Sequence, residues 1–272
     1  MYHILLGGGT LGYKHIKQIE RPMGNGCTEP FLAITDDNVQ VVIKLFNNIE
    51  GNLVLFNEYV CYHLAKTIGL RIPRGDAFLV DKTTMYKNGV VAPANFGVCY
   101  GSEYMEHSLQ LNHGIIRKLL NLDDYYKMIL FDHLVFNTDR NIGNLLTRIM
   151  KKEQYLYVID HTHVFKNQAI WCSSDLERGM DELDFSDNSI LCENERCYNY
   201  FFQNVGIDED KLKIAASVFD SKINYDIIKR IIESVPNEWR CSEDDANSLA
   251  RYLSYRLAHI NDYCDLILNY NK

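Results

Sequence analysis

Three oxygen-bearing side chains in the middle of the chain are spaced so that one reversal of the backbone would bring them together. Asp139 and Asn144 lie five positions apart in the polar segment FNTDRNIGN, and Asp160 ends the segment YLYVID. Between them, LLTRIM and YLYV are short runs of strand-forming residues about the polar turn MKKEQ, which predicts a β-hairpin. The hairpin would return Asp160 to the neighbourhood of Asn144. The sequence therefore predicts one local cluster of carboxylate and amide oxygens.

This cluster suits phosphoryl transfer from ATP. That chemistry uses an aspartate near the acceptor hydroxyl, an asparagine five residues later, and a second aspartate after a strand, the last two as ligands of Mg²⁺. Mg²⁺ is a hard cation that prefers oxygen ligands. We expect Asp139 to act as base or orienter, and Asn144 and Asp160 to bind the metal. For any one of these residues, the alternative is a polar loop without chemistry.

Three residues beside these have other expected roles. Arg140 follows Asp139 and either stabilises the transferring charge or braces the loop. His161 and His163 follow the metal-binding aspartate, but Mg²⁺ prefers oxygen, so we expect hydrogen-bonded scaffolding rather than metal ligands.

A second half of the site is predicted upstream, at Lys44 and Glu58. Lys44 lies in the strand-like segment VVIKLF, where its ammonium group would hold ATP phosphates. Glu58 lies in an amphipathic helical segment, on the same face as Val54, Leu55 and Cys61. An unpaired charge on that face would cost several kcal/mol, so the carboxylate needs a partner. Lys44 is the natural candidate; the alternative is a solvated lysine with Glu58 at the edge of the apolar face.

A glycine-containing loop precedes the strand-like segment FLAIT. Gly24 and Gly26 would let backbone amides approach phosphates, and the small side chains of Cys27 and Thr28 would not obstruct them. As a motif this segment is weak.

A rival glycine motif occurs earlier. Gly7, Gly9 and Gly12 match the GxGxxG pattern of dinucleotide-binding folds. That fold would require a following helix, a second strand and further alternation of strands and helices. The chain continues instead into RPMGNGCTEP, so we expect no dinucleotide-binding fold.

Composition limits the possible partners and the location. With a net charge of −8 and no cluster of Lys and Arg, the chain is not expected to bind nucleic acid directly or an anionic membrane surface. No segment reads as a signal peptide or a bilayer-spanning helix, so we expect a cytoplasmic protein. The eight cysteines form no CxxC pair and are expected to be reduced.

The secondary-structure pattern of the sequence changes near residue 105. Residues 1–105 contain the strand-like segments FLAIT, VQVVIKLF and DAFLV and one clear helix, LVLFNEYVCYHLAKTIGL. Residues 106–272 are mostly helical apart from the polar loop and the hairpin, with helical periodicity from about 209 onward broken at SVPNEW. We expect an α+β, two-lobed fold with a small sheet-containing lobe and a larger helical lobe.

Six blocks in order resemble the HipA-like kinases, in particular their short stand-alone branch, and more distantly the phosphatidylinositol kinases. They span residues 21 to 167 approximately and read GNGCTEPFLAITDD, VVIKLF, NEYVCYHLAKTIGLRIP, YGSEYME, FDHLVFNTDRNIGN and YLYVIDHTHVF.

The resemblance implies a protein-kinase-like fold and an ATP- and Mg²⁺-dependent enzyme. It implies that Glu58 orients Lys44 and that YGSEYME is the hinge, where backbone groups of Glu103 and Tyr104 meet adenine. It also implies a Ser or Thr acceptor in a protein and an antitoxin-type regulator. A small-molecule or lipid kinase and an inactive nucleotide-binding module are the alternatives, and the region beyond residue 168 is expected to carry substrate choice.

The chain departs from the pattern of many kinases directly after Asp160. His161 and Thr162 follow Asp160 where those kinases have Phe and Gly, so a glycine-hinged switch is not expected. In HipA-like kinases the glycine-rich loop can be autophosphorylated on serine; here the matching hydroxyl is Thr28, whose phosphate would compete with ATP for the same amides.

Overall fold

A closed ring of strands forms the first part of the molecule. The computed structural model describes residues 12–24 and 26–270, and in this part of the chain the first sheet has six strands in the order β2-β3-β6-β4-β1-β5. β1 pairs in parallel with β4 and antiparallel with β2, so the sheet closes on itself. The strands are β1 (Lys14–Pro22), β2 (Phe31–Thr35), β3 (Gln40–Lys44), β4 (Gly75–Val80), β5 (Met85–Tyr86) and β6 (Gly97–Glu103).

A small apolar core fills this ring. It includes Ile16, Ile19, Val41, Ile43 and Cys99, from strands on different sides of the ring. Alternating side chains of a strand point to opposite faces, which explains why Val41 and Ile43 both enter this core while Val42 between them does not.

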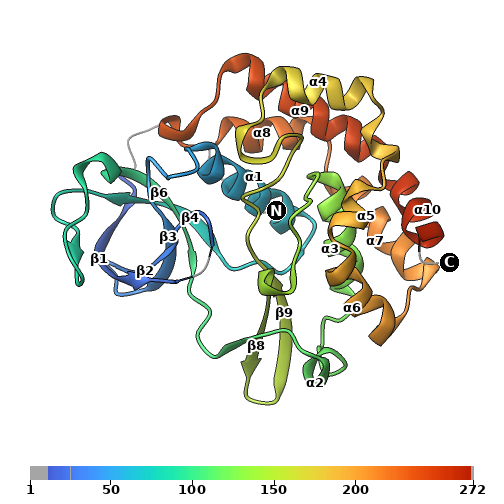
Figure 1. Cartoon of the computed structure of the whole chain (residues 1–272), viewed down its shortest axis with the longest axis horizontal. Helices are drawn as coiled ribbons and strands as arrows, with labels where there is room; N and C mark the ends of the chain where they lie inside the picture. Colours follow the sequence, from blue (N-terminus) through green and yellow to red (C-terminus); the bar gives the residue numbers. More distant parts are fainter. Residues whose placement is uncertain (1–11, 25, 271–272) are drawn as a thin grey trace.

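Helix α1 (Leu53–Thr67) lies between the sheet and the other helices (Figure 1). It confirms the helix predicted in this segment. Val54, Leu55 and Leu64 are fully buried and belong to the large apolar core that also contains the helices of the second half. α1 therefore packs with the helices of the second half as well as with the sheet of the first. For this reason the predicted boundary between the two lobes at about residue 105 stays a prediction.

A second, smaller sheet carries the predicted hairpin. β7 (Ser108–Gln110), β8 (Leu145–Met150) and β9 (Glu153–Val158) pair antiparallel in that order. Leu145 lies opposite Val158, and the turn between β8 and β9 contains Lys151 with a positive φ of 57°. The predicted reversal is therefore present.

Helices form the rest of the chain. α3 is at the centre of the helical part, with α7, α9 and α10 packed against it. The helices are α2 (His113–Ile116), α3 (Asp124–Leu134), α4 (Ser173–Asp181), α5 (Ser189–Glu193), α6 (Glu195–Val205), α7 (Glu209–Lys222), α8 (Tyr225–Glu233), α9 (Glu243–Ala258) and α10 (Ile260–Tyr270). Short 3₁₀ turns occur at Pro93–Asn95, Ile142–Asn144, Gln168–Ile170, Asp184–Ser186 and Asn237–Trp239.

The helices begin where the sequence offers capping side chains. Asp208, Asn224 and Ser242 each accept a hydrogen bond from a backbone N–H three residues later, which satisfies a donor that the first helical turn leaves free. The predicted break at SVPNEW corresponds to the 3₁₀ turn Asn237–Trp239. Among the described helices, none combines the length and apolar character needed to cross a bilayer.

The α+β, two-lobed architecture confirms the predicted fold class. The mainly antiparallel sheet also differs from the alternating parallel sheet that a dinucleotide-binding fold requires. Of the rival motif, Gly7 and Gly9 lie outside the described residues, and Gly12 lies just before β1.

Candidate active site

The side chain of Lys44 connects β3, α1 and the segment that follows β9. Lys44 is the last residue of β3, and its Nζ donates to Glu58 Oε1 of α1 at 2.5 Å and to Asp160 Oδ1 at 2.9 Å. It also donates to the hydroxyl of Thr162, which in turn donates to Asp160 Oδ1 at 2.8 Å. Lys44 is 8% exposed and Glu58 4%. The predicted ion pair is present, and Asp160, 116 positions after Lys44, belongs to the same cluster.

Opposite charges hold this cluster in its ionised state. Burial by itself would lower the pKa of Lys44, but the carboxylates of Asp160 and Glu58 more than offset it, so that pKa is raised. Burial would likewise raise the pKa of Asp160, but the ammonium of Lys44 and the hydroxyl of Thr162 lower it well below its usual value. The ammonium is therefore charged at neutral pH and held beside a charged carboxylate.

Asn144 and Asp160 lie at the same end of the β8–β9 hairpin. Asn144 directly precedes β8, Asp160 follows β9 by two residues, and the backbone N–H of Ile159 donates to the carbonyl of Asn144 at 3.0 Å. Asp160 has a positive φ of 59°, an uncommon conformation for a residue other than glycine and one that clusters at functional sites.

The oxygens at this end of the hairpin suit a hard divalent cation. Asn144 donates its amide N–H to the carbonyl of Asp139 at 3.0 Å, which leaves its amide oxygen available. Among the described residues, neither this oxygen nor Oδ2 of Asp160 has a hydrogen-bond donor as partner. The donor set therefore fits Mg²⁺ with two protein ligands. Within the same residues, no group of three His, Cys, Asp or Glu side chains is arranged to hold a metal.

Asp139 is the most exposed of the predicted central residues. Its side chain is 49% exposed, and its Oδ2 lies 3.3 Å from Nδ1 of His163. Nε2 of His163 lies 2.9 Å from Oε2 of Glu50, in the turn between β3 and α1. The backbone N–H of Asp139 donates to the side chain of Asn137 at 2.9 Å, which shapes the loop.

Arg140 points away from Asp139 into the protein. Its guanidinium is fully buried and donates to both carboxylate oxygens of Asp132, at 2.8 and 3.0 Å. It also donates to the carbonyl of Ile159 at 2.8 Å and lies 3.0 Å from Nε2 of His161. Of the two roles left open by the sequence, this geometry favours bracing of the loop. His161 is part of this scaffold, and burial lowers its pKa so that it stays neutral.

Asn194, at the junction of α5 and α6, fixes the loop from the other side. Its side chain accepts from the backbone N–H of Arg140 at 2.8 Å and donates to the carbonyl of Asn137 at 2.7 Å. Tyr198 of α6 donates to Asp132 at 3.1 Å. The helices beyond residue 168 therefore help to hold the loop that carries Asp139.

The predicted phosphate-binding loop joins β1 and β2. Gly24 and Gly26 have φ values of 79° and 100°, in the left-handed region that favours glycine. Cys27 is exposed, whereas Thr28 is only 4% exposed and its carbonyl accepts a hydrogen bond from Asn48 at 2.9 Å. Phosphorylation of Thr28, expected as a possible control, would require this loop to open.

The predicted hinge has its backbone groups partly engaged. The N–H of Glu103 donates to the carbonyl of Arg74 at 2.8 Å, and the N–H of Tyr104 donates to the carbonyl of Gln40 at 3.1 Å. The carbonyl of Tyr104 accepts from the N–H of Glu106 at 3.1 Å. For Tyr104, hydrogen bonds to adenine would therefore have to replace the bonds that its N–H and carbonyl now make with Gln40 and Glu106.

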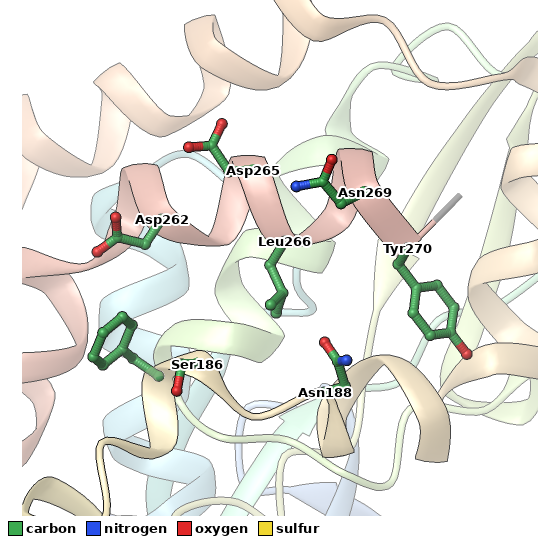
Figure 2. Close-up of a pocket in the computed structure, with 8 residues that line it drawn as sticks. Ser186, Asn188, Asp262, Asp265, Leu266, Asn269 and Tyr270 are labelled. Atoms are coloured by element: carbon green, nitrogen blue, oxygen red, sulfur yellow. The ribbon is translucent and has the colours of Figure 1, made fainter. Parts of the chain in front are cut away.

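A pocket of about 650 Å³ lies next to the loop that carries Asp139. Its lining includes Glu50, Thr138 and His163 as well as the exposed side chains of Ile170 and Arg178. A second pocket, of about 400 Å³, lies between α10 and the segment before α5, with Asp262 and Asp265 along the helix (Figure 2). This second pocket contains none of the predicted site residues.

Two contact residues, Thr162 and Glu50, were not predicted from the sequence. Thr162 bridges Lys44 and Asp160, and Glu50 contacts His163, the expected scaffolding histidine that lies beside Asp139. The position of Thr162 between two histidines directly after Asp160 is the signal that could have drawn attention to it. Glu50 gave no such signal, because its partner lies 113 positions away.

Comparison with known proteins relates this geometry to kinases. A family model described as HipA-like kinase matches residues 16–178. No curated protein sequence matches the chain significantly.

Solved kinase structures share the fold at low sequence identity. The Helicobacter pylori proinflammatory kinase CtkA is 16% identical, with a TM-score of 0.61 over 92% of this chain and 95% of CtkA. The Golgi casein kinase with Mn/ADP bound is 15% identical, with a TM-score of 0.53 over 94% of this chain and 74% of that kinase. Shewanella oneidensis HipA, solved with HipB and operator DNA, is 12% identical, with a TM-score of 0.51 over 96% of this chain and 67% of HipA. Because the family model covers more than half of the chain and the fold agrees with it, the chain belongs to the HipA-like kinase family.

Proposed function

We propose that the protein is an ATP- and Mg²⁺-dependent kinase that transfers the γ-phosphate to a hydroxyl group, namely Ser or Thr of a protein. The contact of Lys44 with both Glu58 and Asp160 carries this proposal. It joins the strand lysine, the helix glutamate and the metal-binding aspartate of the kinase arrangement at one buried point. The family and the fold of CtkA support it independently.

Each residue of the cluster has a distinct task. Lys44 would hold the α- and β-phosphates, and Glu58 keeps its ammonium in place. Asn144 and Asp160 would hold the metal; Mg²⁺, when bound, offsets negative charge on the phosphate oxygens. Gly24, Gly26, Cys27 and Thr28 would offer backbone amides to the phosphates, and the hinge at Glu103 and Tyr104 would contact adenine. The Golgi casein kinase, which shares the fold, was solved with Mn/ADP bound, and this supports a metal–nucleotide complex as the ligand.

Asp139 would receive the acceptor. Its half-exposed carboxylate contacts His163, which lines the pocket of about 650 Å³, so a hydroxyl entering from this pocket could be held in line with the γ-phosphate. Ile170 on the wall of this pocket is 69% exposed, which suits an acceptor carried on a polypeptide with apolar side chains.

The proposal also covers the regulatory partner of the protein and its location in the cell. Shewanella oneidensis HipA belongs to a toxin–antitoxin system and was solved with HipB, so an antitoxin-type regulator is proposed for this chain too. The net charge of −8 argues against direct contact with DNA or an anionic membrane surface, and we propose a cytoplasmic location.

Intact-mass analysis after incubation with Mg·ATP tests the proposal, first on the protein itself and then with protein extract as acceptor. The parent should add phosphate to itself or to an extract protein, whereas Asp139→Ala and Asp160→Asn should not. Asp123→Asn is a matched control, because Asp123 is an exposed aspartate paired with Lys211 away from the site. In parallel, calorimetry measures the binding of ATP to the protein with and without Mg²⁺. Binding without turnover would support an inactive nucleotide-binding module, and phosphate transfer only to small molecules or lipids would refute the protein acceptor.

A further inference from the structure

His163 connects two carboxylates that belong to different parts of the fold. Its Nδ1 lies 3.3 Å from Asp139 Oδ2, and its Nε2 lies 2.9 Å from Glu50 Oε2. Glu50 lies in a turn between β3 and α1, held by the bond from the N–H of Gly51 to the carbonyl of Asn48 at 2.8 Å. Gly51 has a φ of 87°, which favours glycine there. The three side chains therefore form a bridge from the Lys44 strand and α1 to the loop that carries Asp139.

The chemistry of the bridge requires a charged imidazole. Ionised carboxylates only accept hydrogen bonds, and a neutral imidazole has one donor, so only an imidazolium can donate to Asp139 and Glu50 together. The hydrogen bond with Asp139 accordingly raises the pKa of His163, although partial burial opposes this.

Other charges near His163 have their own partners. Lys166 and Arg178 line the same pocket, but Lys166 lies 3.7 Å from Glu182, and Arg178 pairs with Asp175 at 2.9 Å. Neither cation pairs with Asp139. Among the described residues, the side chain that contacts the carboxylate of Asp139 is that of His163.

We propose that His163 is a positioning residue that holds the carboxylate of Asp139 toward the acceptor, and that Glu50 fixes His163 in turn. This role rests on the proposed function of Asp139. A half-exposed aspartate with no side-chain contact would rotate freely, and misplacement by about 1 Å can cost roughly a hundredfold in rate. Because Glu50 follows the Lys44 strand, the same bridge links the orientation of Asp139 to the placement of the phosphate-binding lysine.

The first test observes the bridge without using activity. Histidine side chains labelled with ¹⁵N are titrated by NMR, and the His163 signal is identified by its absence in His163→Ala. We expect the titration midpoint of His163 to lie above that of an ordinary histidine and to fall in both Asp139→Asn and Glu50→Gln. A midpoint that does not respond to either neighbour would overturn the bridge.

The second test observes positioning through ADP release with Mg·ATP. In His163→Ala we expect kcat to fall by about tenfold or more while KM for ATP changes less than about twofold, since His163 touches no group assigned to ATP. Glu50→Gln should cause a smaller loss in kcat, and adding His163→Ala to Asp139→Ala should cause no further loss. His113→Ala, which removes an exposed histidine of α2, is the control.

The outcomes separate the two proposals. A parent kcat that is retained in His163→Ala overturns the positioning role even if the titration shows the bridge. A parent without any phosphate transfer or ADP release refutes the proposed function and with it the positioning role, whereas the bridge itself still stands or falls with the titration.

Discussion

The buried pair of Arg140 and Asp132 offers a quantitative test of what Arg140 does. Both side chains are fully buried, and within the described part of the chain Arg140→Met would leave the carboxylate of Asp132 with two neutral donors, Tyr198 at 3.1 Å and Asn137 at 2.9 Å. Breaking such a pair from one side costs about 3–5 kcal/mol, because the remaining charge stays buried without its counterion. For a chain of this size that corresponds to a fall in Tm of roughly 6–10 °C.

Removing the second charge should restore part of the loss. In Arg140→Met with Asp132→Asn, no ionised group is left behind, and the amide oxygen can still accept from Tyr198 or Asn137. We expect this double variant to be more stable than Arg140→Met alone, by about 2 kcal/mol. Arg251→Met is the matched control: its ion pair with Glu177 joins two half-exposed side chains at the surface, and its loss should cost less than about 1 kcal/mol.

Thermal unfolding followed by circular dichroism measures these differences, and ADP release at 15 °C measures activity. If Arg140 braces the loop, the double variant should keep its kcat within about tenfold of the parent once folded. An arginine that stabilises the transferring phosphoryl group is worth about 10³–10⁵ in kcat. A loss of that size in a stable double variant would refute the bracing role, and a Tm change below about 2 °C in Arg140→Met would refute the energetic reasoning.

Three further predictions concern the ion pair, a buried histidine and the sheet. Glu58→Gln should weaken binding of Mg·ATP about tenfold, since Lys44 loses a charged partner worth about 1.5 kcal/mol; calorimetry measures this, and a Kd within twofold of the parent would contradict it. Burial lowers the pKa of His133 from 6.5 to about 3, so the unfolded chain binds a proton below pH 6.5 that the folded chain does not. The contribution of neutral His133 to stability is therefore complete above pH 6.5 and lost as pH falls toward 3, and His133→Leu should make Tm less sensitive to pH in that range; an unchanged slope would count against it. Gly101→Ala should destabilise by about 1–3 kcal/mol in urea unfolding, because the added Cβ would meet the ring of Phe78 at 2.7 Å; unchanged stability would show that the strand can shift.

The hairpin and the ion pair could be predicted from the sequence because short-range rules determine them. The alternation of strand-forming residues about MKKEQ fixes the reversal that brings Asp160 beside Asn144. The position of Glu58 on the apolar face of a helix requires a partner, and Lys44 on the preceding strand is within reach. In both cases the constraint lies within about twenty residues.

The network around Arg140 could not be predicted in the same way. A charged residue next to Asp139 suggests a catalytic or a bracing role equally, and its partner Asp132 lies in a helix whose sequence reads as apolar core. His133 illustrates the same limit: the helical pattern around it accounts for its burial and its stacking on Tyr263, but among the described residues neither ring nitrogen has a hydrogen-bond partner. Burial follows from the pattern of a helix, whereas hydrogen-bond partners depend on residues far away in the chain.

Neighbouring residues on α1 connect Lys44 to the segment that follows Asp160. Glu58 contacts Lys44 and Thr162, while Asn57 donates to the carbonyl of Thr162 at 2.8 Å and accepts from the indole of Trp171 at 2.9 Å. A segment anchored at both Thr162 and Trp171 to a buried helix has little freedom to swing out as a switch. This agrees with the absence of a glycine after Asp160. Any regulation of Lys44 and Asp160 should therefore act through the loop between β1 and β2 or through a bound partner, because a movement of the segment from Thr162 to Trp171 would also break the buried contacts of α1.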